Sequence, residues 1–304
     1  MSALLRRVLP DDDLDALMSG TTAWEGADYV RGLVSASAEQ GSEQFIAEID
    51  GRTVGYAHCI ARPLTAGGRG AANVWVVPSA RGEGTGMALW RAAVGAARAA
   101  NLRGLRVVAD LNDERSLSIA AAHGLAKGRA RVESRLDLRA LDDSVIAGAI
   151  DKASAQGAEL RLLDAGGDDE WGRFYEDFAV LFKDMPEEAE GRQPPSLDWV
   201  MENFGAPWQV LLARQGDRTV GMTMAFVRGD ASWKLVIYFT GVLPAQRGKG
   251  LATALMAEHA RRLGAAGWRR LHTWNLEGND PIFAANARLG FVPVGGHQEL
   301  VLDL

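Results

Sequence analysis

The chain has 304 residues, which exceeds the usual size of one hydrophobic core and predicts two domains. Its formal net charge of −6 and pI near 5.5 argue against a nucleic-acid-binding protein and suit a small, often cationic, substrate. One cysteine, five histidines and no long apolar stretch predict a cytoplasmic protein with no internal disulfide, no metal site and no membrane partner, whereas the composition gives no oligomeric state.

The first half of the chain predicts an alternation of strands and helices. After an N-terminal strand and a helical region, residues 44–61 (QFIAEIDGRTVGYAHCIA) predict two strands joined by a tight Asp-Gly turn. A further strand ends at Val76, a glycine-rich turn follows, and residues 87–100 have the apolar spacing of an amphipathic helix. The strand 105–110, a short helix and a closing pair of strands complete this series, which we expect to end at Leu138.

The same series then starts again. Residues 139–158 predict a linker with a helical patch. Residues 209–227 (QVLLARQGDRTVGMTMAFV) predict two strands joined by a turn, and the run KLVIYFTGV at 234–242 predicts the next strand. A second glycine-rich turn, an amphipathic helix over 252–267, the strand 269–274, a short helix and a closing pair of strands lead to the last residue.

This series is a duplication, because four motifs recur at one spacing. PSARGEGTGMAL at Pro78 and PAQRGKGLATAL at Pro244 are 166 positions apart. The same spacing relates GRTVG to DRTVG, HGL to LGF, and RLDL to VLDL. We therefore expect an N-terminal domain over 1–138, the linker over 139–158 and a C-terminal domain over 159–304, each of the α/β class with a mixed sheet covered by helices.

The second copy carries about 11 additional residues upstream of its first shared strand. We place them in an acidic and proline-bearing stretch that predicts a loop from Lys183 to Ser196. A cluster of carboxylates attracts cationic molecules, although a solvated surface loop has the same composition. These carboxylates belong to Asp184, Glu187, Glu188 and Glu190.

The glycine-rich turns carry the main chemical signal. Glycine lets the backbone approach a ligand closely, and the first N–H groups of a helix have no intrahelical partner, so each turn predicts a phosphate cradle. A Walker loop is excluded because Gly250, not Ser or Thr, follows Lys249. A dinucleotide-binding fingerprint is excluded because Thr253 and Met87 occupy the third glycine position. A turn with solvated cations is the non-functional alternative.

The turns instead resemble the pyrophosphate loop of the GNAT (GCN5-related) N-acetyltransferases, which lies between a strand and a helix and is rich in Arg, Gln and Gly. The resemblance covers nearly the whole chain as two GNAT domains in tandem, and it implies acetyl-CoA as the cofactor. The loop residues that it implies in the second copy are Arg247, Gly248, Lys249, Gly250, Leu251 and Ala252. In the first copy they are Arg81, Gly82, Glu83, Gly84, Thr85 and Gly86.

The resemblance also implies contacts to the pantetheine arm of the cofactor. They fall on Thr240, Gly241 and Val242 in the second copy, on Val76 in the first, and on Asn279 before the last short helix. The first copy has Asp113 at the position of Asn279. Independently of the resemblance, a glycine inside a strand, such as Gly241, predicts a bulge or a close approach.

Acetyl transfer to an amine needs a base and a proton donor. Many GNAT members use a tyrosine as the donor, but its position holds Asn286 in the second copy and Ala120 in the first. We expect Tyr238 to replace it, although a tyrosine in a strand is also a common core residue. Glu277 is the expected base, with His272 as the second choice, and an exposed loop glutamate is the structural alternative.

The acidic loop, Asn279 and the Gly-Phe pair at 290–291 favour the second copy as the catalytic one. The first copy is then regulatory, structural or degenerate. We expect an enzyme that transfers an acetyl group from acetyl-CoA to a primary amine of a small molecule. Two alternatives stay open. One is acetylation of a cysteinyl-sugar precursor, since tandem GNAT proteins of this length resemble mycothiol synthase, and the other is acetyl-CoA binding without transfer.

Overall fold

The computed structural model describes residues 3–8, 42–64, 67–164, 168–185, 194–227 and 235–304. The chain forms two compact units, of which the first comprises Met1–Ala130 together with His297–Leu304 and the second comprises Arg131–Gly296. The predicted helical region before residue 42 lies outside the described residues. None of the described helices is both long enough and apolar enough to cross a membrane.

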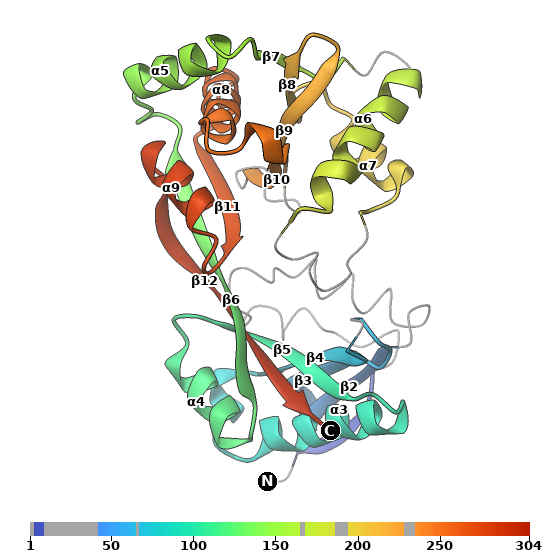
Figure 1. Ribbon diagram of the computed structural model, residues 1–304. Coiled ribbons are helices and arrows are strands. Elements are labelled where there is room, and N and C mark those ends of the chain that lie inside the picture. The colour runs from blue at the N-terminus through green and yellow to red at the C-terminus, as the bar shows by residue number, and fades with distance from the viewer. Residues whose placement is uncertain (1–2, 9–41, 65–66, 165–167, 186–193, 228–234) are drawn as a thin grey trace. The chain divides into compact units, whose positions relative to one another are not determined.

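The first unit is a mixed sheet with a long helix, α3, against it (Figure 1). Its strands are hydrogen-bonded in the order β1-β2-β3-β4-β5-β12, antiparallel except for β4 and β5. The helices are α3 (Thr85–Ala99) and α4 (Glu114–Ala122). The strands are β1 (Leu4–Arg7), β2 (Ser42–Ile49), β3 (Arg52–Ile60), β4 (Arg69–Val76), β5 (Gly104–Asp110) and β12 (Val292–Asp303).

The second unit repeats this plan with additional helices. Its strands run in the order β6-β11-β10-β9-β8-β7, and β10 and β11 are the parallel pair. The strands are β6 (Ala126–Asp137), β7 (Glu159–Leu162), β8 (Val210–Gln215), β9 (Arg218–Val227), β10 (Leu235–Val242) and β11 (Arg270–Leu276). The helices are α5 (Asp143–Ser154), α6 (Asp168–Phe182), α7 (Leu197–Phe204), α8 (Leu251–Ala265) and α9 (Asp280–Arg288).

Apolar side chains bury both faces of the second unit's sheet. Helices α5, α8 and α9 cover one face, where Leu235, Ile237 and Leu271 are buried. Helices α6 and α7 cover the other face, where the rings of Phe178 and Phe239 lie 5.3 Å apart, edge to face. The expected mixed sheet covered by helices is thus confirmed, and the helical patch expected in the linker is α5.

The expected closing pair of strands is wrong in both copies. Residues 126–137 and 292–303 each form one continuous strand, and Gly295 and Gly296, with φ of 159° and 152°, lie inside the second strand and form no turn. The second half of β6 pairs with β11 of the second unit, from Leu276↔Arg131 to Arg270↔Asp137. The second half of β12 pairs with β5 of the first unit. The closing strands of the two copies are therefore exchanged, and the expected boundary at Leu138 falls inside the second unit.

Candidate functional site

The two glycine-rich loops have the same backbone conformation. A single turn of 3₁₀-helix, Pro78–Ala80 or Pro244–Gln246, ends each strand, and an extended arginine follows it. Two glycines of each loop then have positive φ, 89° and 83° for Gly82 and Gly84, and 75° and 86° for Gly248 and Gly250. L-residues with a side chain rarely adopt this left-handed region, so the sequence pattern at these positions has a steric cause.

The helices that start in these loops have uncapped N-termini. Gly84 and Gly250 are the N-cap residues of α3 and α8, and no side chain caps either helix. By contrast, the side chains of Asp113, Asp142 and Ser196 cap α4, α5 and α7. The N–H groups at the start of α3 and α8 therefore keep their capacity to bind an anion, which the helix dipole also favours.

The arginine of each loop braces the end of the preceding strand. Nε of Arg247 donates to the carbonyl oxygen of Val242 at 3.1 Å, and Nε of Arg81 donates to that of Val76 at 2.8 Å. Nη2 of Arg247 also forms an ion pair with Asp184 at 2.8 Å. Asp184 is the described member of the expected acidic cluster, whereas Glu187, Glu188 and Glu190 lie outside the described residues.

Within the described residues, the parallel strands β10 and β11 pair over three positions. Leu235, Val236 and Ile237 oppose Leu271, His272 and Thr273, and the described pairing does not continue past Ile237. The register of β10 with β9 shifts between Ile237 and Phe239, which makes Tyr238 an extra residue on β10. β10 and β11 thus part after Ile237, which leaves an opening between them, and Thr240, Gly241 and Val242 lie on β10 beyond this point.

Gly241 is required by a close approach, as the sequence indicated. A Cβ atom at this position would lie 2.4 Å from Cζ of Phe239, which is closer than real Cβ contacts. Next to it, the hydroxyl oxygens of Thr240 and Thr223 are 2.9 Å apart, so Thr240 is tied to β9. These contacts fix the edge of β10 that faces the opening.

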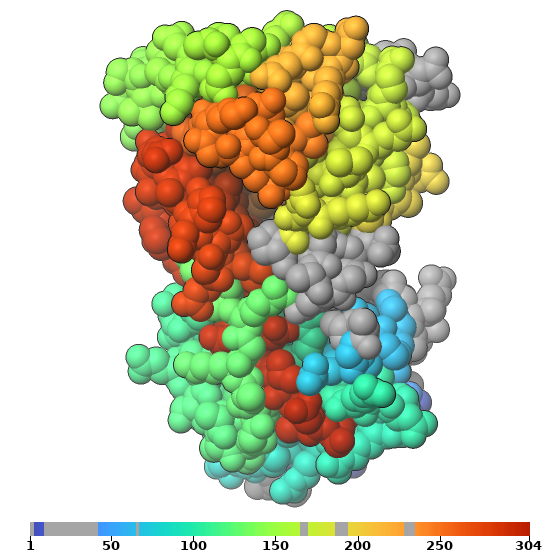
Figure 2. All heavy atoms as spheres, viewed as in Figure 1, coloured from blue at the N-terminus to red at the C-terminus, as the bar shows by residue number. Residues whose placement is uncertain are grey.

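The linker helix α5 packs beside the second loop. In Figure 2, α5 (light green) lies against α8 (orange). A Cβ atom at Gly250 would lie 3.4 Å from Cδ of Lys152 and 3.7 Å from its Nζ. Gln156 donates to the carbonyl oxygen of Lys249 at 3.1 Å, and Nζ of Lys249 donates to Gln246 at 3.1 Å. These contacts hold the second loop, whereas nothing lies within 4 Å of a Cβ atom at Gly84.

Asn279 and Asp113 occupy equivalent positions but differ in their contacts. Asp113 caps α4: its Oδ2 accepts from the Ser116 hydroxyl and its Oδ1 accepts from Ser116 N at 3.0 Å, and these two bonds, the hydroxyl one first, lower the pKa of its carboxyl group. Asn279 is the N-cap residue of α9, yet its side chain makes no capping hydrogen bond. Within the described chain, the Asn279 amide is therefore available to a ligand and the Asp113 carboxylate is engaged.

The residues predicted to transfer protons lie in different surroundings. Tyr238 is partly buried, with its ring 5.2 Å from that of Phe204 and 6.0 Å from that of Phe226. Glu277 is exposed in the turn after β11. His272 is 5% exposed, and its Nδ1 lies 2.7 Å from Oε1 of Glu133.

Asn286, which stands at the tyrosine position, is buried and donates through Nδ2 to Asn275 at 2.9 Å. An amide carries no titratable proton near neutral pH, so this contact positions α9 on β11.

The first unit has a side chain across its own strand opening. Strands β4 and β5 also pair over three residues only, from Arg69↔Gly104 to Ala71↔Arg106. Beyond this point, Oδ1 of Asn73 accepts a hydrogen bond from the N–H of Val108 at 3.3 Å. The equivalent residue of the second copy is Phe239, whose ring packs toward α6.

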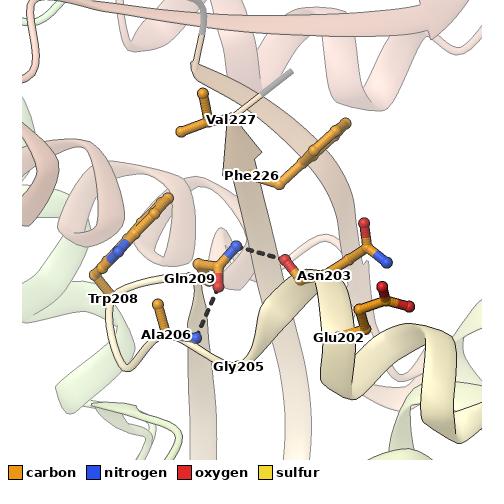
Figure 3. Close-up of a pocket in the computed structure, with 8 residues that line it drawn as sticks. All are labelled: Glu202, Asn203, Gly205, Ala206, Trp208, Gln209, Phe226 and Val227. Carbon is orange, nitrogen blue, oxygen red and sulfur yellow. Dashed lines mark hydrogen bonds between the residues drawn. The ribbon is translucent and has the colours of Figure 1, made fainter. Parts of the chain in front are cut away.

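A separate hollow of about 490 Å³ lies where α7 meets the end of β9 (Figure 3). Gln209 closes the loop behind it, accepting from Ala206 N at 2.8 Å and donating to the carbonyl oxygen of Asn203 at 2.6 Å. No residue predicted from the sequence lines this hollow, but the ring of Phe226 connects it to Tyr238. Its lining residues are Glu202, Asn203, Gly205, Ala206, Trp208, Gln209, Phe226 and Val227.

Comparison with known proteins shows the family to which the chain belongs. Residues 171–291 match the model of the acetyltransferase (GNAT) family, and residues 40–125 match the model of an acetyltransferase (GNAT) domain. The chain therefore belongs to the GNAT acetyltransferase family and contains two GNAT domains. A search of curated proteins found no match.

Solved structures with the same fold include a tandem protein. A GCN5-related N-acetyltransferase from Sphaerobacter thermophilus has a TM-score of 0.72 at 19% identity, with 99% of this chain and 95% of that chain covered. A tandem GNAT protein of the clavulanic acid biosynthesis pathway has a TM-score of 0.69 at 19% identity, with coverages of 99% and 98%. The GCN5-related glucosamine N-acetyltransferase region of a fungal multi-domain β-N-acetylglucosaminidase has a TM-score of 0.73 at 15% identity, with coverages of 99% and 38%.

Sequence reasoning missed Glu133 and Lys152. Glu133 lies in the closing strand of the first copy, and only the exchange of strands brings it to β11. Lys152 lies in the linker, which has no counterpart in the repeat to draw attention to it. The one available signal was the helical patch itself, since an amphipathic helix needs a surface on which to pack.

Proposed function

We propose that the chain transfers an acetyl group from acetyl-CoA to a primary amine of a small molecule, and that the second unit carries this activity. The observation that carries the proposal is the combination of an uncapped glycine loop at the start of α8 with the parting of β10 and β11. The family match supports acetyl transfer as the reaction.

The residues present fit a pyrophosphate group. Gly248 and Gly250 leave the N–H groups at the start of α8 uncovered, and Lys249 and Lys152 add positive charge beside them. Successive N–H groups in such a turn form a concave nest for an anion. The loop residues Arg247 to Ala252 would hold the pyrophosphate, while Thr240 to Val242 and Asn279 would contact the pantetheine arm. Bound acetyl-CoA supplies the acetyl group as a reactive thioester.

The first unit fits the same group less well. Its loop keeps the glycine conformations, but Glu83 replaces Lys249 and places a like charge beside the phosphates. The Asn73 side chain also crosses the opening between β4 and β5. We infer that the first unit binds acetyl-CoA more weakly than the second, or not at all.

The hollow in Figure 3 is the candidate site for the acceptor. The rings of Trp208 and Phe226 and the carboxylate of Glu202 line it, and aromatic faces with a carboxylate suit an organic cation. Phe226 lies against Tyr238, which begins the proposed cofactor opening. The fungal relative's name includes glucosamine, a small primary amine, which agrees with an acceptor of this class.

The direct test is release of CoA thiol from acetyl-CoA in the presence of an amine panel. Polyamines, aminoglycosides, amino sugars, amino acids and a cysteinyl-sugar precursor cover the proposed class and the mycothiol-related alternative. Amine-dependent release supports transfer. Tight acetyl-CoA binding without release by any amine supports the alternative of a binding protein.

A further inference from the structure

We propose that His272 and Glu133 form the proton-transfer pair of the second unit, so that the exchanged strand of the first copy completes the second copy's site. This inference rests on the proposed acetyl transfer. Nδ1 of His272 and Oε1 of Glu133 are 2.7 Å apart, and the two side chains are 7% and 12% exposed. A carboxylate at this distance fixes both the orientation and the tautomer of an imidazole.

The second ring nitrogen of His272 has no partner among the described residues. Nε2 is buried and forms no hydrogen bond with any of them. Buried polar atoms are nearly always hydrogen-bonded, and leaving one unpaired costs about 1–3 kcal/mol. Because Nδ1 faces the carboxylate and carries the proton, the lone pair of neutral His272 is on Nε2. That is the state a general base requires.

His272 also lies where the strands part. It opposes Val236 in the three-residue pairing of β10 and β11, and the opening begins one residue later. Leu271 and Ile237 point into the core under α8, so alternation places His272 on the opposite face, which also carries Tyr238. The imidazole thus stands at the end of the opening that is nearest to Tyr238.

Charged neighbours surround the pair on this face. On β6, Arg135 is directly opposite His272, and Glu133 is directly opposite Trp274. The ring of Trp274 stacks on the imidazole of His272, with 6.4 Å between the ring centroids. From the neighbouring strands, the charged or titratable groups on this face are Glu133, Arg135 and Arg131 of β6 and Tyr238 of β10.

The equivalent pair of the first unit lacks a base. At the repeat spacing of 166 residues, Glu133 corresponds to Glu299 and His272 to Arg106. Arg106 Nε donates to Oε1 of Glu299, so the carboxylate is kept in both units while its partner differs. An arginine stays protonated in proteins and cannot accept a proton. The difference favours the second unit for base catalysis, independently of the loops.

The proposed step balances as follows. The acceptor arrives as an ammonium ion, and Nε2 of His272 takes one proton from its nitrogen. The neutral amine attacks the thioester carbonyl carbon, the C–N bond forms and the C–S bond breaks. The second proton of the nitrogen neutralises the departing thiolate, and His272 returns its proton to solvent. Glu133 stays ionised throughout, stabilises the imidazolium and is a positioning residue.

The experiment compares His272→Gln and Glu133→Gln with a matched control, His259→Gln. His259 is also buried with one unpartnered ring nitrogen, but it bonds to the Trp208 carbonyl oxygen and lies in α8, away from the opening. Acetyl-CoA affinity is measured by calorimetry, turnover by CoA release across pH 6–10, and the tautomer of His272 by nitrogen-15 NMR of the free wild-type protein.

We expect NMR to show that the neutral imidazole of His272 carries its proton on Nδ1. His272→Gln should lower kcat by about 100-fold or more at neutral pH, with the loss shrinking as pH approaches the amine pKa near 10. Glu133→Gln should lower kcat about tenfold or more, and His259→Gln should not change it. All three should bind acetyl-CoA within about twofold of wild type.

A neutral tautomer with the proton on Nε2, or a pH–turnover profile of His272→Gln that matches wild type, would overturn the proposed roles of His272 and Glu133. Loss of acetyl-CoA binding in His272→Gln would also overturn it, because the role would then be structural. Absence of turnover in the wild type with every amine would contradict the proposed function instead. In that case the His272 tautomer seen by NMR alone tests the His272–Glu133 pair.

Discussion

Nε of Arg247 donates a hydrogen bond to the carbonyl oxygen of Val242, and Arg81 repeats this contact with Val76 in the other unit. The loop arginine therefore holds the strand end and the loop together in both copies. In the second unit the guanidinium of Arg247 also forms an ion pair with the carboxylate of Asp184. The arginine thus has a structural role besides the charge expected from the sequence.

This relationship predicts different effects for charge and geometry. Arg247→Lys keeps the charge but loses the hydrogen bond to the Val242 carbonyl oxygen, so acetyl-CoA affinity should fall about tenfold. Asp184→Asn releases the guanidinium, and because the ion pair is exposed, affinity should rise only about two- to fivefold. Calorimetry at two salt concentrations measures both effects, with Glu176→Gln on α6, the helix before Asp184, as the control. Equal affinities for Arg247→Lys and wild type would show that the hydrogen bond from Arg247 to Val242 does not contribute to acetyl-CoA binding.

The strand exchange predicts that each closing strand stabilises the other copy's unit. Leu300 of β12 and Leu136 of β6 are both 2% exposed, so truncation to alanine should cost about 2–5 kcal/mol in each case. Leu300→Ala should speed amide hydrogen exchange in β5 of the first unit. Leu136→Ala should speed it in β11 of the second unit. The reverse assignment would show that the strands are not exchanged in solution.

The buried histidines predict loss of stability in acid. Burial lowers the pKa of His259 in the second unit to about 4, and it does the same for His58 in the first unit. Since the unfolded chain binds a proton near pH 6.5 and the folded chain does not, stability is full above pH 6.5 and is lost as pH falls toward 4.

Each histidine contributes on the order of 3 kcal/mol to this loss. His259→Gln, which can still donate to Trp208, should flatten the fall in unfolding free energy between pH 6.5 and 4. Urea unfolding at four pH values measures it, and curves parallel to those of wild type would show that His259 does not titrate on unfolding.

Glu277 and Tyr238 stay predictions for the proton-transfer residues, and they can be tested against His272. Tyr238→Phe removes only a hydroxyl group, so it should lower turnover modestly with no change in acetyl-CoA affinity. Glu277 is exposed in a turn, and with His272 as the base, Glu277→Gln should retain most of the activity. A loss of about 100-fold in Glu277→Gln, together with a normal His272→Gln variant, would return the role of base to Glu277.

The sequence predicted the two loops and the order of elements up to the closing strands, because both depend on local chemistry. Apolar periodicity marks each strand and helix, and the positive φ at Gly84 and Gly250 requires glycine. The exchange of closing strands could not be predicted. Equivalent strands alternate in the same way, so either one satisfies the buried face of either sheet. Lys152 and Glu133 were missed for the same reason, since their partners come from outside their own repeat.

The first copy raises a separate prediction about which loop matters. Gly84→Val and Gly250→Val impose the same strain, because φ is 83° and 86° at these positions. Gly84→Val should leave turnover with a competent amine unchanged, since Glu83 and Asn73 already weaken the first unit's site. Loss of turnover in Gly84→Val would make the first unit catalytic.

Calorimetry of acetyl-CoA binding to Gly250→Val tests the central claim most directly. A β-branched valine is strained at the φ of 86° that Gly250 adopts, so it should force the loop out of the left-handed conformation that exposes the N–H groups of α8. The account predicts a folded protein, verified by circular dichroism, that no longer binds acetyl-CoA measurably at the second unit. Unchanged affinity in that folded variant would contradict the assignment of residues 247–252 as the pyrophosphate site.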